Sequence, residues 1–534
     1  MKKQIIITVI LLIATAITTV VYFKNLNPPS VRTNRILATI PNDASLIFEF
    51  NNDKSFYEVF TGNKLFINLV GSKNIVELDT LKKQLLQDSF LEKYFSGQNI
   101  FVSLHPNKEN IIELLFTTSI NNGVEVRNIF EYFSQPSKLF TAGQFNYGSK
   151  KGFSLYINSL KKTFYILLND ENIVSASFSK DLVEQSSNHK TAAEKIQFEL
   201  PDNLQNSNSL ANLYINYNQL IPLFSRLFKN KNEDICETLE QISGLASLSL
   251  NYHSDAVLFS GITNYDLKKK PGYLDLFKFQ KPIVNQLKDI LPSTTAYCTT
   301  YSISDPLKFQ TDLTNYQTSE GLKKEKDQLF TSIKNKTGTR FKTEFSKLFG
   351  YEFALVTTKY FEKFAIINVK DGSKLKELLT KTSKMYDKMS GQFEQQGIPT
   401  FLFGEVFDNF KRPYFTVIDN YLVLANSKNE LSSFYDLYLN RKFLIKNDKY
   451  KQFDYLLAER CNISFLVNFK NTLPVLKRDL LPEVYDIIDK NPGAYDEYYS
   501  ASCQFSASDK SFYSNFCLKF NPDSAISKQE TSTP

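Results

Sequence analysis

The sequence is poor in the residues on which metal and nucleotide chemistry depend. Its 534 residues include no tryptophan, three histidines, five cysteines and 18 glycines. No HExxH, Cys-x-x-Cys or EF-hand pattern occurs, so we predict no metal site and interpret His105, His189 and His253 as surface or turn residues. The glycines form neither GxxxxGK[ST] nor GxGxxG, whose backbone N–H groups bind phosphate, and no GxSxG is present. We therefore expect no cofactor and no nucleotide.

The five cysteines are an odd and widely scattered set, unlike the framework of a small disulfide-rich domain. Cys503 and Cys517 are close enough to meet across a predicted hairpin. They are not placed symmetrically about its expected turn at Ser508 and Asp509, so a bridge between them remains an alternative. We expect buried free thiols at Cys236, Cys298, Cys461, Cys503 and Cys517.

Neither charge sign dominates the chain. The formal net charge is +7, and lysine alternates with aspartate and glutamate throughout, so no basic stripe for nucleic acid is present. Apolar residues make up 42% and aromatic residues 14%, which is a globular composition. A chain of this length predicts two to four domains at about 150 residues each.

A single long hydrophobic run occurs, at the N-terminus. Lys2 and Lys3 precede an uncharged stretch over residues 5–23, which is about 19 residues or roughly 28 Å of helix, enough to span a bilayer. We predict a transmembrane anchor over residues 1–24 and an extended spacer over 25–38. The alternative is a signal peptide cleaved after Ala16, against which the apolar run continues to Phe23.

The orientation of the anchor follows from its form. Lys24, Arg32 and Arg35 nearly balance the positive charges before the run, so the charge difference is indecisive. A very short basic leader ahead of an apolar run is typical of secretory segments. We therefore expect the body of the protein outside the cytoplasm, on the periplasmic side of the inner membrane.

The body shows an internal duplication. Six short matches recur in one order at a separation of roughly 250 residues. They are Pro41 with Pro292, Gly97 with Gly350, Gly123 with Gly372, Val174 with Val423, Pro222 with Pro474, and Ser254-Asp255 with Ser508-Asp509. Two tandem copies are predicted, residues 39–265 and 291–520, with a connector over 266–290 and a disordered tail over 521–534.

Each copy alternates strand and helix periodicities. Period-2 runs predict strands, and leucines at helical spacing predict helices. The runs are Ala211, Leu213, Ile215 and Tyr217, then Ile463, Phe465, Val467 and Phe469; the leucines are Leu78, Leu81 and Leu85, then Leu375, Leu378 and Leu379. The predicted order is strand, helices, strand pair, helix, several strands, helices, strand, helix and closing hairpin. This predicts an α+β fold, a mostly antiparallel sheet with helices packed on one face.

Short patterns typical of penicillin-binding enzymes occur in the sequence, as they often do in a chain rich in lysine, serine and asparagine. Ser177-x-x-Lys180 and Ser159-x-x-Lys162 match SxxK, Ser186-x-Asn188 matches SxN, and Lys336-Thr337-Gly338 matches KTG. The chemistry needs the serine at the start of a buried helix, whereas Ser177 closes a predicted strand. Tyr214, Tyr217 and Tyr252 could line a glycan or lipid groove, but core packing explains their strand spacing equally. We assign no catalytic, cofactor-binding or metal-binding residue.

The phrase Pro41-Asn42-Asp43-Ala44-Ser45, after an anchor and ahead of a doubled unit, resembles membrane-anchored bacterial envelope proteins with a duplicated domain of unknown function. The second copy keeps Pro292 but has Thr294 in place of the aspartate. The resemblance implies an extracytoplasmic, membrane-attached protein and supplies no site residue.

The sequence thus predicts a non-catalytic envelope protein with a duplicated binding or scaffold module. Its partners would be the membrane, through residues 5–23, and another envelope protein, a lipid or a polysaccharide. The alternatives are a carrier or chaperone for an apolar ligand such as a lipid and, less favoured, a cell-wall hydrolase.

Overall fold

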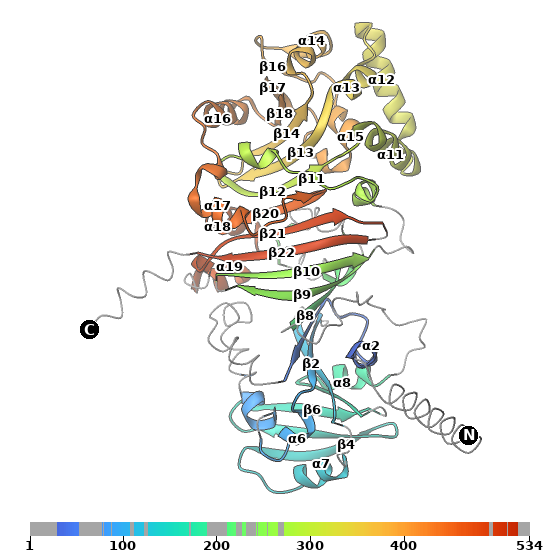
Figure 1. Cartoon of the computed structure of the whole chain (residues 1–534), viewed down its shortest axis with the longest axis vertical. Helices are drawn as coiled ribbons and strands as arrows, with labels where there is room; N and C mark the ends of the chain where they lie inside the picture. The colour runs from blue at the N-terminus through green and yellow to red at the C-terminus, as the bar shows by residue number, and fades with distance from the viewer. Residues whose placement is uncertain are drawn as a thin grey trace, which may run out of the picture. The chain divides into compact units, whose positions relative to one another are not determined.

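The computed structural model describes most of the body of the protein (Figure 1). Described are residues 29–52, 77, 80–86, 88–106, 112–121, 126–169, 172–188, 211–220, 227–230, 242, 244–253, 255–264, 272–490, 495–509 and 511–521. The predicted anchor and the predicted tail after residue 521 lie outside them. No helix in the described ranges is long and apolar enough to cross a membrane. Internal contacts divide the chain into two compact units, Met1–Tyr214 and Ile215–Pro534.

The first unit is built on an antiparallel sheet. Along the sheet the strands run β8, β1, β2, β3, β7, β6, β5, β4, with antiparallel pairing from β1 to β4. Their bounds are β1 Leu46–Asn51, β2 Asn99–Pro106, β3 Ile112–Ser119, β4 Phe140–Tyr147, β5 Lys150–Ile157, β6 Lys162–Leu168, β7 Ile173–Ser177 and β8 Ala211–Asn216, of which the first four residues belong to this unit. The helical segments are α2 Pro29–Leu37, a π-helical turn Lys82–Leu86, α6 Glu92–Phe95, α7 Val126–Phe133 and α8 Lys180–Ser186. The prediction of an extended spacer over residues 25–38 is wrong for its described part, because α2 is helical and packs Ile36 and Leu37 into the core.

The second unit contains a longer antiparallel sheet. Its strands follow one another as β9, β10, β22, β21, β20, β12, β13, β14, β18, β17, β16, β15. Their bounds are β9 Leu245–His253, β10 Ala256–Asn264, β12 Thr295–Ser302, β13 Phe349–Thr358, β14 Lys363–Val369, β15 Lys384–Met385, β16 Ser390–Gln392, β17 Tyr414–Ile418, β18 Tyr421–Ala425, β20 Ile463–Asn468, β21 Tyr498–Ala507 and β22 Ser511–Phe520. A separate pair joins β11 Ile283–Val284 to β19 Arg460–Cys461.

Helices pack on both faces of this sheet, so the prediction of one covered face is wrong. All eight residues of β12 are buried, which one layer of helices could not achieve. Cys298 and Val356 face a core shared with α16 and α17, whereas Tyr301 and Phe353 stack at 4.8 Å on the other side. The helical segments are η4 Tyr273–Phe277, η5 Leu287–Ile290, α11 Pro306–Ser319, α12 Lys323–Thr337, α13 Phe341–Leu348, α14 Gly372–Thr382, α15 Ile398–Phe403, η6 Glu405–Phe407, α16 Lys428–Leu439, η7 Leu444–Lys446, α17 Asp448–Asp454, α18 Phe469–Asp479 and α19 Pro482–Lys490.

Capping side chains set the helix starts in the second unit. The Asp305 carboxylate accepts the N–H groups of Leu307 and Lys308 at the start of α11. Ser427 and Glu430 form a capping box at the start of α16, where each side chain bonds the other's backbone N–H. These caps satisfy donors that the first helical turn leaves unpaired.

The predicted element order is confirmed in residues 291–520. The chain there runs β12, helices α11 to α13, the pair β13–β14, α14, strands β15 to β18, helices α16 and α17, strands β19 and β20, α18 and α19, then the hairpin β21–β22. The order departs from the prediction at one place, because the helical segments α15 and η6 lie between β16 and β17. Leu375, Leu378 and Leu379 are buried on α14 as expected. Tyr217 and Phe469 are exceptions, because each follows the end of its strand and begins a helical segment.

The closing hairpin turns one residue later than predicted. Ala507 pairs with Phe512, and the Ser508 N–H donates to the Ser511 carbonyl, so the turn lies between Ser508 and Ser511. Cys517 pairs with Ser502 rather than Cys503. The described cysteines are free thiols, as expected; Cys298, Cys461 and Cys517 are buried, whereas Cys503 is half-buried, and Cys236 lies outside the described residues.

Candidate functional site

The penicillin-binding patterns occupy structural positions. Ser177 closes β7, as predicted, and its buried hydroxyl donates to the Leu114 carbonyl at 2.7 Å. The Thr337 hydroxyl donates to the Ile333 carbonyl at 2.8 Å inside α12. Lys336 is exposed and paired with Glu394. The remaining pattern residues lie at a turn, a strand start and the end of α8; they are Ser159, Lys162, Ser186 and Asn188.

One histidine is buried, contrary to the sequence interpretation. His105 lies on β2, where its Nδ1 is 2.8 Å from Asp43 Oδ1 and its Nε2 is 2.8 Å from Ser103 Oγ. His253 is exposed at the end of β9, beside a turn, as predicted. His189 lies outside the described residues.

The chain Asp43, His105, Ser103 has the order of acid, base and nucleophile found in hydrolase triads. A nucleophile must reach substrate, yet Ser103 has 0% of its surface exposed and its hydroxyl also lies 3.4 Å from the Leu115 carbonyl. The bonds instead fasten the turn before β1 to β2. Ser103 and His105 were detectable as neighbours on one strand face, but no sequence pattern indicated that Asp43 would join them.

A buried carboxylate, Glu49 on β1, organises a second polar cluster in the first unit. It accepts hydrogen bonds from Thr33 Oγ1 at 3.1 Å, Asn99 Nδ2 at 2.6 Å, Asn212 Nδ2 at 3.0 Å and the Tyr214 hydroxyl at 2.5 Å. Burial, followed by the Glu49 charge, raises the pKa of Tyr214 well above its ordinary value. The cluster joins α2, β1, β2 and β8, and it places Tyr214 in the core as the packing alternative predicted.

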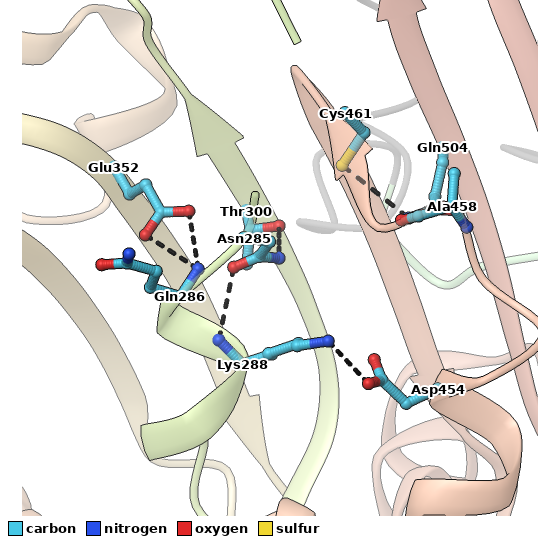
Figure 2. Close-up of polar contacts among 9 residues, drawn as sticks. All are labelled: Asn285, Gln286, Lys288, Thr300, Glu352, Asp454, Ala458, Cys461 and Gln504. Carbon is cyan, nitrogen blue, oxygen red and sulfur yellow. Dashed lines mark hydrogen bonds and ion pairs between the residues drawn. The ribbon is translucent and has the colours of Figure 1, made fainter. Parts of the chain in front are cut away.

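The second unit buries a carboxylate at Glu352 on β13 (Figure 2). Its two oxygens lie 2.9 and 3.1 Å from the backbone N of Gln286, and the Ser302 hydroxyl donates at 3.3 Å. These donors are uncharged. Burial therefore raises the pKa of the Glu352 carboxyl from 4.5 to about 7, although the hydrogen bonds oppose the shift.

The predicted connector closes over this carboxylate. Asn285 Nδ2 donates to Thr300 Oγ1 at 3.0 Å, and Asn285 Oδ1 accepts the Lys288 N–H at 3.3 Å. Lys288 Nζ then pairs with Asp454 Oδ2 on α17 at 2.6 Å, as Figure 2 shows. The segment that leads into β12 is thus tied to the sheet and to a helix.

A buried amide completes the arrangement in Figure 2. Gln504 accepts the Ala458 N–H at 2.7 Å, donates to the Ala458 carbonyl at 2.9 Å and lies 3.7 Å from Cys461 Sγ. Burial raises the pKa of the Cys461 thiol to about 12, so it is not a thiolate at neutral pH. The thiol is therefore neither a ready nucleophile nor a ready metal ligand.

The two polar clusters lie at the strand pairs β1–β2 and β12–β13, with the carboxylate on the first strand in one pair and on the second strand in the other. On β1 and β2, Asn51 Nδ2 donates to Asn99 Oδ1 at 3.2 Å. On β12 and β13, the Ser302 hydroxyl donates to Glu352 at 3.3 Å. Each cluster also bonds the segment that precedes its first strand, through Thr33 in one case and Asn285 in the other. Their shared chemistry is to hold that segment on the sheet.

The described residues form neither a metal site nor a groove lined by Tyr214 and Tyr217. Among the described residues, no group of three or more histidine, cysteine, aspartate or glutamate side chains is placed to hold a metal ion. Tyr217 is buried like Tyr214, which confirms core packing for both. The side chain of Tyr252 lies outside the described part of the chain.

Comparison with known proteins adds little. No family model matches the sequence, and no curated protein matches it. Among solved structures, crystal form III of TP0453 is similar, at 10% identity over 47% of this chain and 88% of that chain, with a TM-score of 0.23. A TM-score this low establishes neither a shared fold nor a shared function. The resemblance to bacterial envelope proteins stays a prediction.

Proposed function

We propose that the protein is a non-catalytic binding or scaffold module of the cell envelope. Residues 5–23 would anchor it in the membrane, and two copies of one α+β unit would form its body outside the cytoplasm. The anchor and the location rest on the sequence alone, on the length of the apolar run and its short basic leader. The binding role rests on one observation, a rigid loop in the second unit that exposes an aromatic side chain.

The loop after η4 carries Phe279 outward. Phe279 is 71% exposed, and Leu307 at the start of α11 is 66% exposed. Lys308 Nζ lies 5.2 Å from the centre of the Phe279 ring and so places α11 beside it. The loop after η4 and the start of α11 thus each present a large exposed apolar side chain, Phe279 and Leu307, and we call this pair the Phe279 knob.

Buried amides hold this loop in place. Gln280 is buried, and its Oε1 accepts the Asp305 N–H at 2.8 Å and the Ser304 hydroxyl at 3.1 Å. Asn462, also buried, donates from Nδ2 to the carbonyls of Gln280 and Lys281, each at 3.2 Å. These hydrogen bonds hold the chain directly after Phe279 in place.

A pre-organised apolar knob is suited to a protein partner. Aromatic anchors that fill a pocket supply most of the energy at protein interfaces, and rigid ones lose little entropy on binding. Ser103 and Glu352, by contrast, are buried and bonded to neighbouring protein groups. The potentially reactive side chains are thus buried, whereas the apolar side chains of the knob are exposed to solvent. This arrangement supports binding rather than catalysis.

The tandem copies are supported by matching strand pairings. In the first part of the chain β1 pairs with β2 and β8, β2 with β3, β3 with β7, β7 with β6, and β9 with β10. In the second part β12 pairs with β13 and β20, β13 with β14, β14 with β18, β18 with β17, and β21 with β22. The two sets correspond strand for strand in chain order.

The closing hairpins of the proposed copies also pair with each other as two-fold equivalents. The pair His253–Ala256 closes the turn of the hairpin β9–β10, and the pair Ser508–Ser511 closes the turn of the hairpin β21–β22. Ser260 is four residues beyond Ala256 and Asn515 is four residues beyond Ser511, so the two residues hold equivalent positions. These two residues lie opposite each other where β10 pairs with β22. In an isologous interface a residue on the axis meets its own equivalent.

A second contact follows the same rule. Phe228 and Leu480 are each six residues beyond the matched prolines Pro222 and Pro474, and they form an antiparallel bridge. The Lys229 N–H donates to the Asp479 carbonyl at 2.8 Å, and its equivalent, the Leu481 N–H, donates to the Leu227 carbonyl at 2.9 Å. Reciprocal bonds of this kind are what a quasi-two-fold axis requires.

The test is affinity purification of the full chain from solubilised membranes, with quantification of co-purifying proteins by mass spectrometry. We expect one protein at stoichiometric yield with the wild type, and a loss of at least about tenfold for Phe279→Ser combined with Leu307→Ser, because the knob is removed. Leu439→Ser on α16 is the matched control, since Leu439 is 61% exposed and lies outside the knob.

Equal recovery with the double variant and the wild type would show that the knob is not the binding surface. Recovery of no stoichiometric protein would count against the binding role itself. A stoichiometric lipid in its place would favour the alternative predicted from the sequence, a carrier for an apolar ligand.

A further inference from the structure

One edge of the first unit's sheet is open in the described part of the chain. β4 pairs with β5 along its whole length, from Phe140 opposite Ile157 to Tyr147 opposite Lys150. The other side of β4 has no strand partner among the described residues. The strand β3 cannot supply one, because β2 and β7 occupy both of its sides. The outward backbone N–H and C=O groups of β4 are therefore available for pairing.

β4 lacks the features by which proteins protect such an edge. It is eight residues long, its sequence FTAGQFNY has neither a charge nor a proline, and its register continues without a bulge. Edge strands are normally kept short, charged, bulged or covered, because an unprotected edge pairs with another strand. Thr141, Gly143, Gln144 and Asn146 are exposed along it.

The second unit shows that the fold does not require a long, uncharged strand at this edge of the sheet. The corresponding end of its sheet consists of β16, Ser390–Gln392, and β15, Lys384–Met385. These strands have three and two residues, and the last one begins with a lysine. One topology therefore carries a blunted edge at one place and a long uncharged edge at the other.

We propose that two copies of the chain associate by antiparallel pairing of β4 with β4. A two-fold axis perpendicular to the sheet would pass beside Gly143 or Gln144, so that each copy presents the same residues to the other. No like charges would face each other across that axis, because β4 carries none. Between β10 and β22 the chain already uses antiparallel edge pairing of equivalent strands.

This inference does not depend on the Phe279 knob, since the knob and β4 lie in different units, but its comparison with the second unit rests on the proposed duplication. A second copy is favoured over a foreign peptide because the edge is complementary to itself. An extended segment of another protein would need side-chain pockets for its specificity, and nothing on β4 indicates them.

The test compares the protein mass of the full-length chain in detergent, by light scattering, with that of two double variants. Gln144→Lys with Asn146→Lys places like charges across the proposed axis, whereas Gln144→Ala with Asn146→Ala removes the same side chains without charge. Both pairs remove the 3.1 Å bond from Gln144 Nε2 to Ser134 Oγ. We expect a dimer for the wild type and the alanine variant, and a monomer for the lysine variant.

A monomeric wild type would overturn the proposal and leave the edge to a segment of a different protein. A lysine variant that stays dimeric, or an alanine variant that becomes monomeric, would overturn it as well. A second measurement does not depend on disrupting the edge. Oxidation of Gln144→Cys should give a disulfide-linked dimer on a non-reducing gel, whereas Thr311→Cys, exposed on α11, should not; linkage at both or neither would overturn the proposal.

Discussion

Two ionisable side chains of the second unit are buried with uncharged hydrogen-bond partners. Burial raises the pKa of Glu352 to about 7 and lowers the pKa of Lys326 to about 7, the latter with a contribution from nearby Lys342. Lys326 Nζ donates to Gln317 Oε1 at 2.6 Å and Thr314 Oγ1 at 3.1 Å. The two side chains change the stability of the fold in opposite directions as the pH rises. Loss of the Glu352 proton creates a buried negative charge and destabilises the fold, whereas loss of the Lys326 proton removes a buried positive charge that destabilised it.

For Glu352 the direction follows from its raised pKa. The folded protein holds the Glu352 proton up to about pH 7, whereas the unfolded chain loses it near 4.5. The stabilising contribution is therefore complete below about pH 4.5 and is lost as the pH rises through 7. Glu352→Gln cannot ionise, so we expect its free energy of unfolding, relative to wild type, to rise by roughly 2–3 kcal/mol from pH 5 to pH 8.

Urea titrations at the two pH values measure this difference, and subtracting the wild type removes the part due to Lys326. Glu344→Gln on α13 is the control, because Glu344 is exposed and paired with Lys347 at the surface. A constant difference between Glu352→Gln and wild type across this range would show that the Glu352 carboxyl is already ionised at pH 5 in the fold.

At the scale of elements, helix α14 begins directly against a hairpin turn. The Gly372 N–H donates to Asn420 Oδ1 at 3.0 Å, and a Cβ at Gly372 would lie 1.9 Å from the Asp419 carbonyl oxygen. The Asp371 carboxylate caps the helix at the Lys374 N–H. The helix start therefore has no room for a side chain.

Gly372→Ala should lower the free energy of unfolding by roughly 2–4 kcal/mol, because either the turn after β17 or the start of α14 must shift. Chemical denaturation measures the loss. Ser373→Ala, one residue on and exposed, should change stability by less than about 0.5 kcal/mol. Similar losses for the two variants would mean that the turn can move freely.

Sequence periodicity was sufficient for the order of elements but not for their layers. The leucine spacing of α14 gave its buried face, because one side of a helix must meet the core. Alternation on β20 suggested one buried face, yet Leu466 packs towards α16 and α17 while Phe465 packs towards α18. A strand buried on both faces loses its hydrophobic alternation, so sequence cannot report the second layer.

The candidate sites could not be predicted from the sequence for another reason. Glu352 and Gln286 are far apart in the chain, as are Asp43 and His105, and no local pattern links them. The fold creates each cluster when a leading segment crosses its sheet. A lone buried glutamate looks the same in sequence as an exposed one.

At the scale of the whole molecule, the closing hairpins provide a test of the strand pairing on which the proposed quasi-two-fold arrangement rests. Ser260→Cys with Asn515→Cys places thiols on opposed residues of β10 and β22, whose Cβ atoms should lie about 4.5–5.5 Å apart. A short bis-maleimide should therefore link them within one chain, detected as a joined peptide by mass spectrometry. Ser260→Cys with Thr311→Cys is the control and should give no joined peptide; the reverse result would exclude the strand pairing.

The pairing of β10 with β22 has a consequence for synthesis. β10 is made near the midpoint of synthesis, but the strand that covers its edge is the last described strand of the chain. About 250 residues separate them, so at 5–20 residues per second the nascent β10 edge stays bare for roughly 10 to 50 seconds. Throughout that interval the growing polypeptide carries an uncovered strand, and protection by a chaperone would matter most before Phe520 leaves the ribosome.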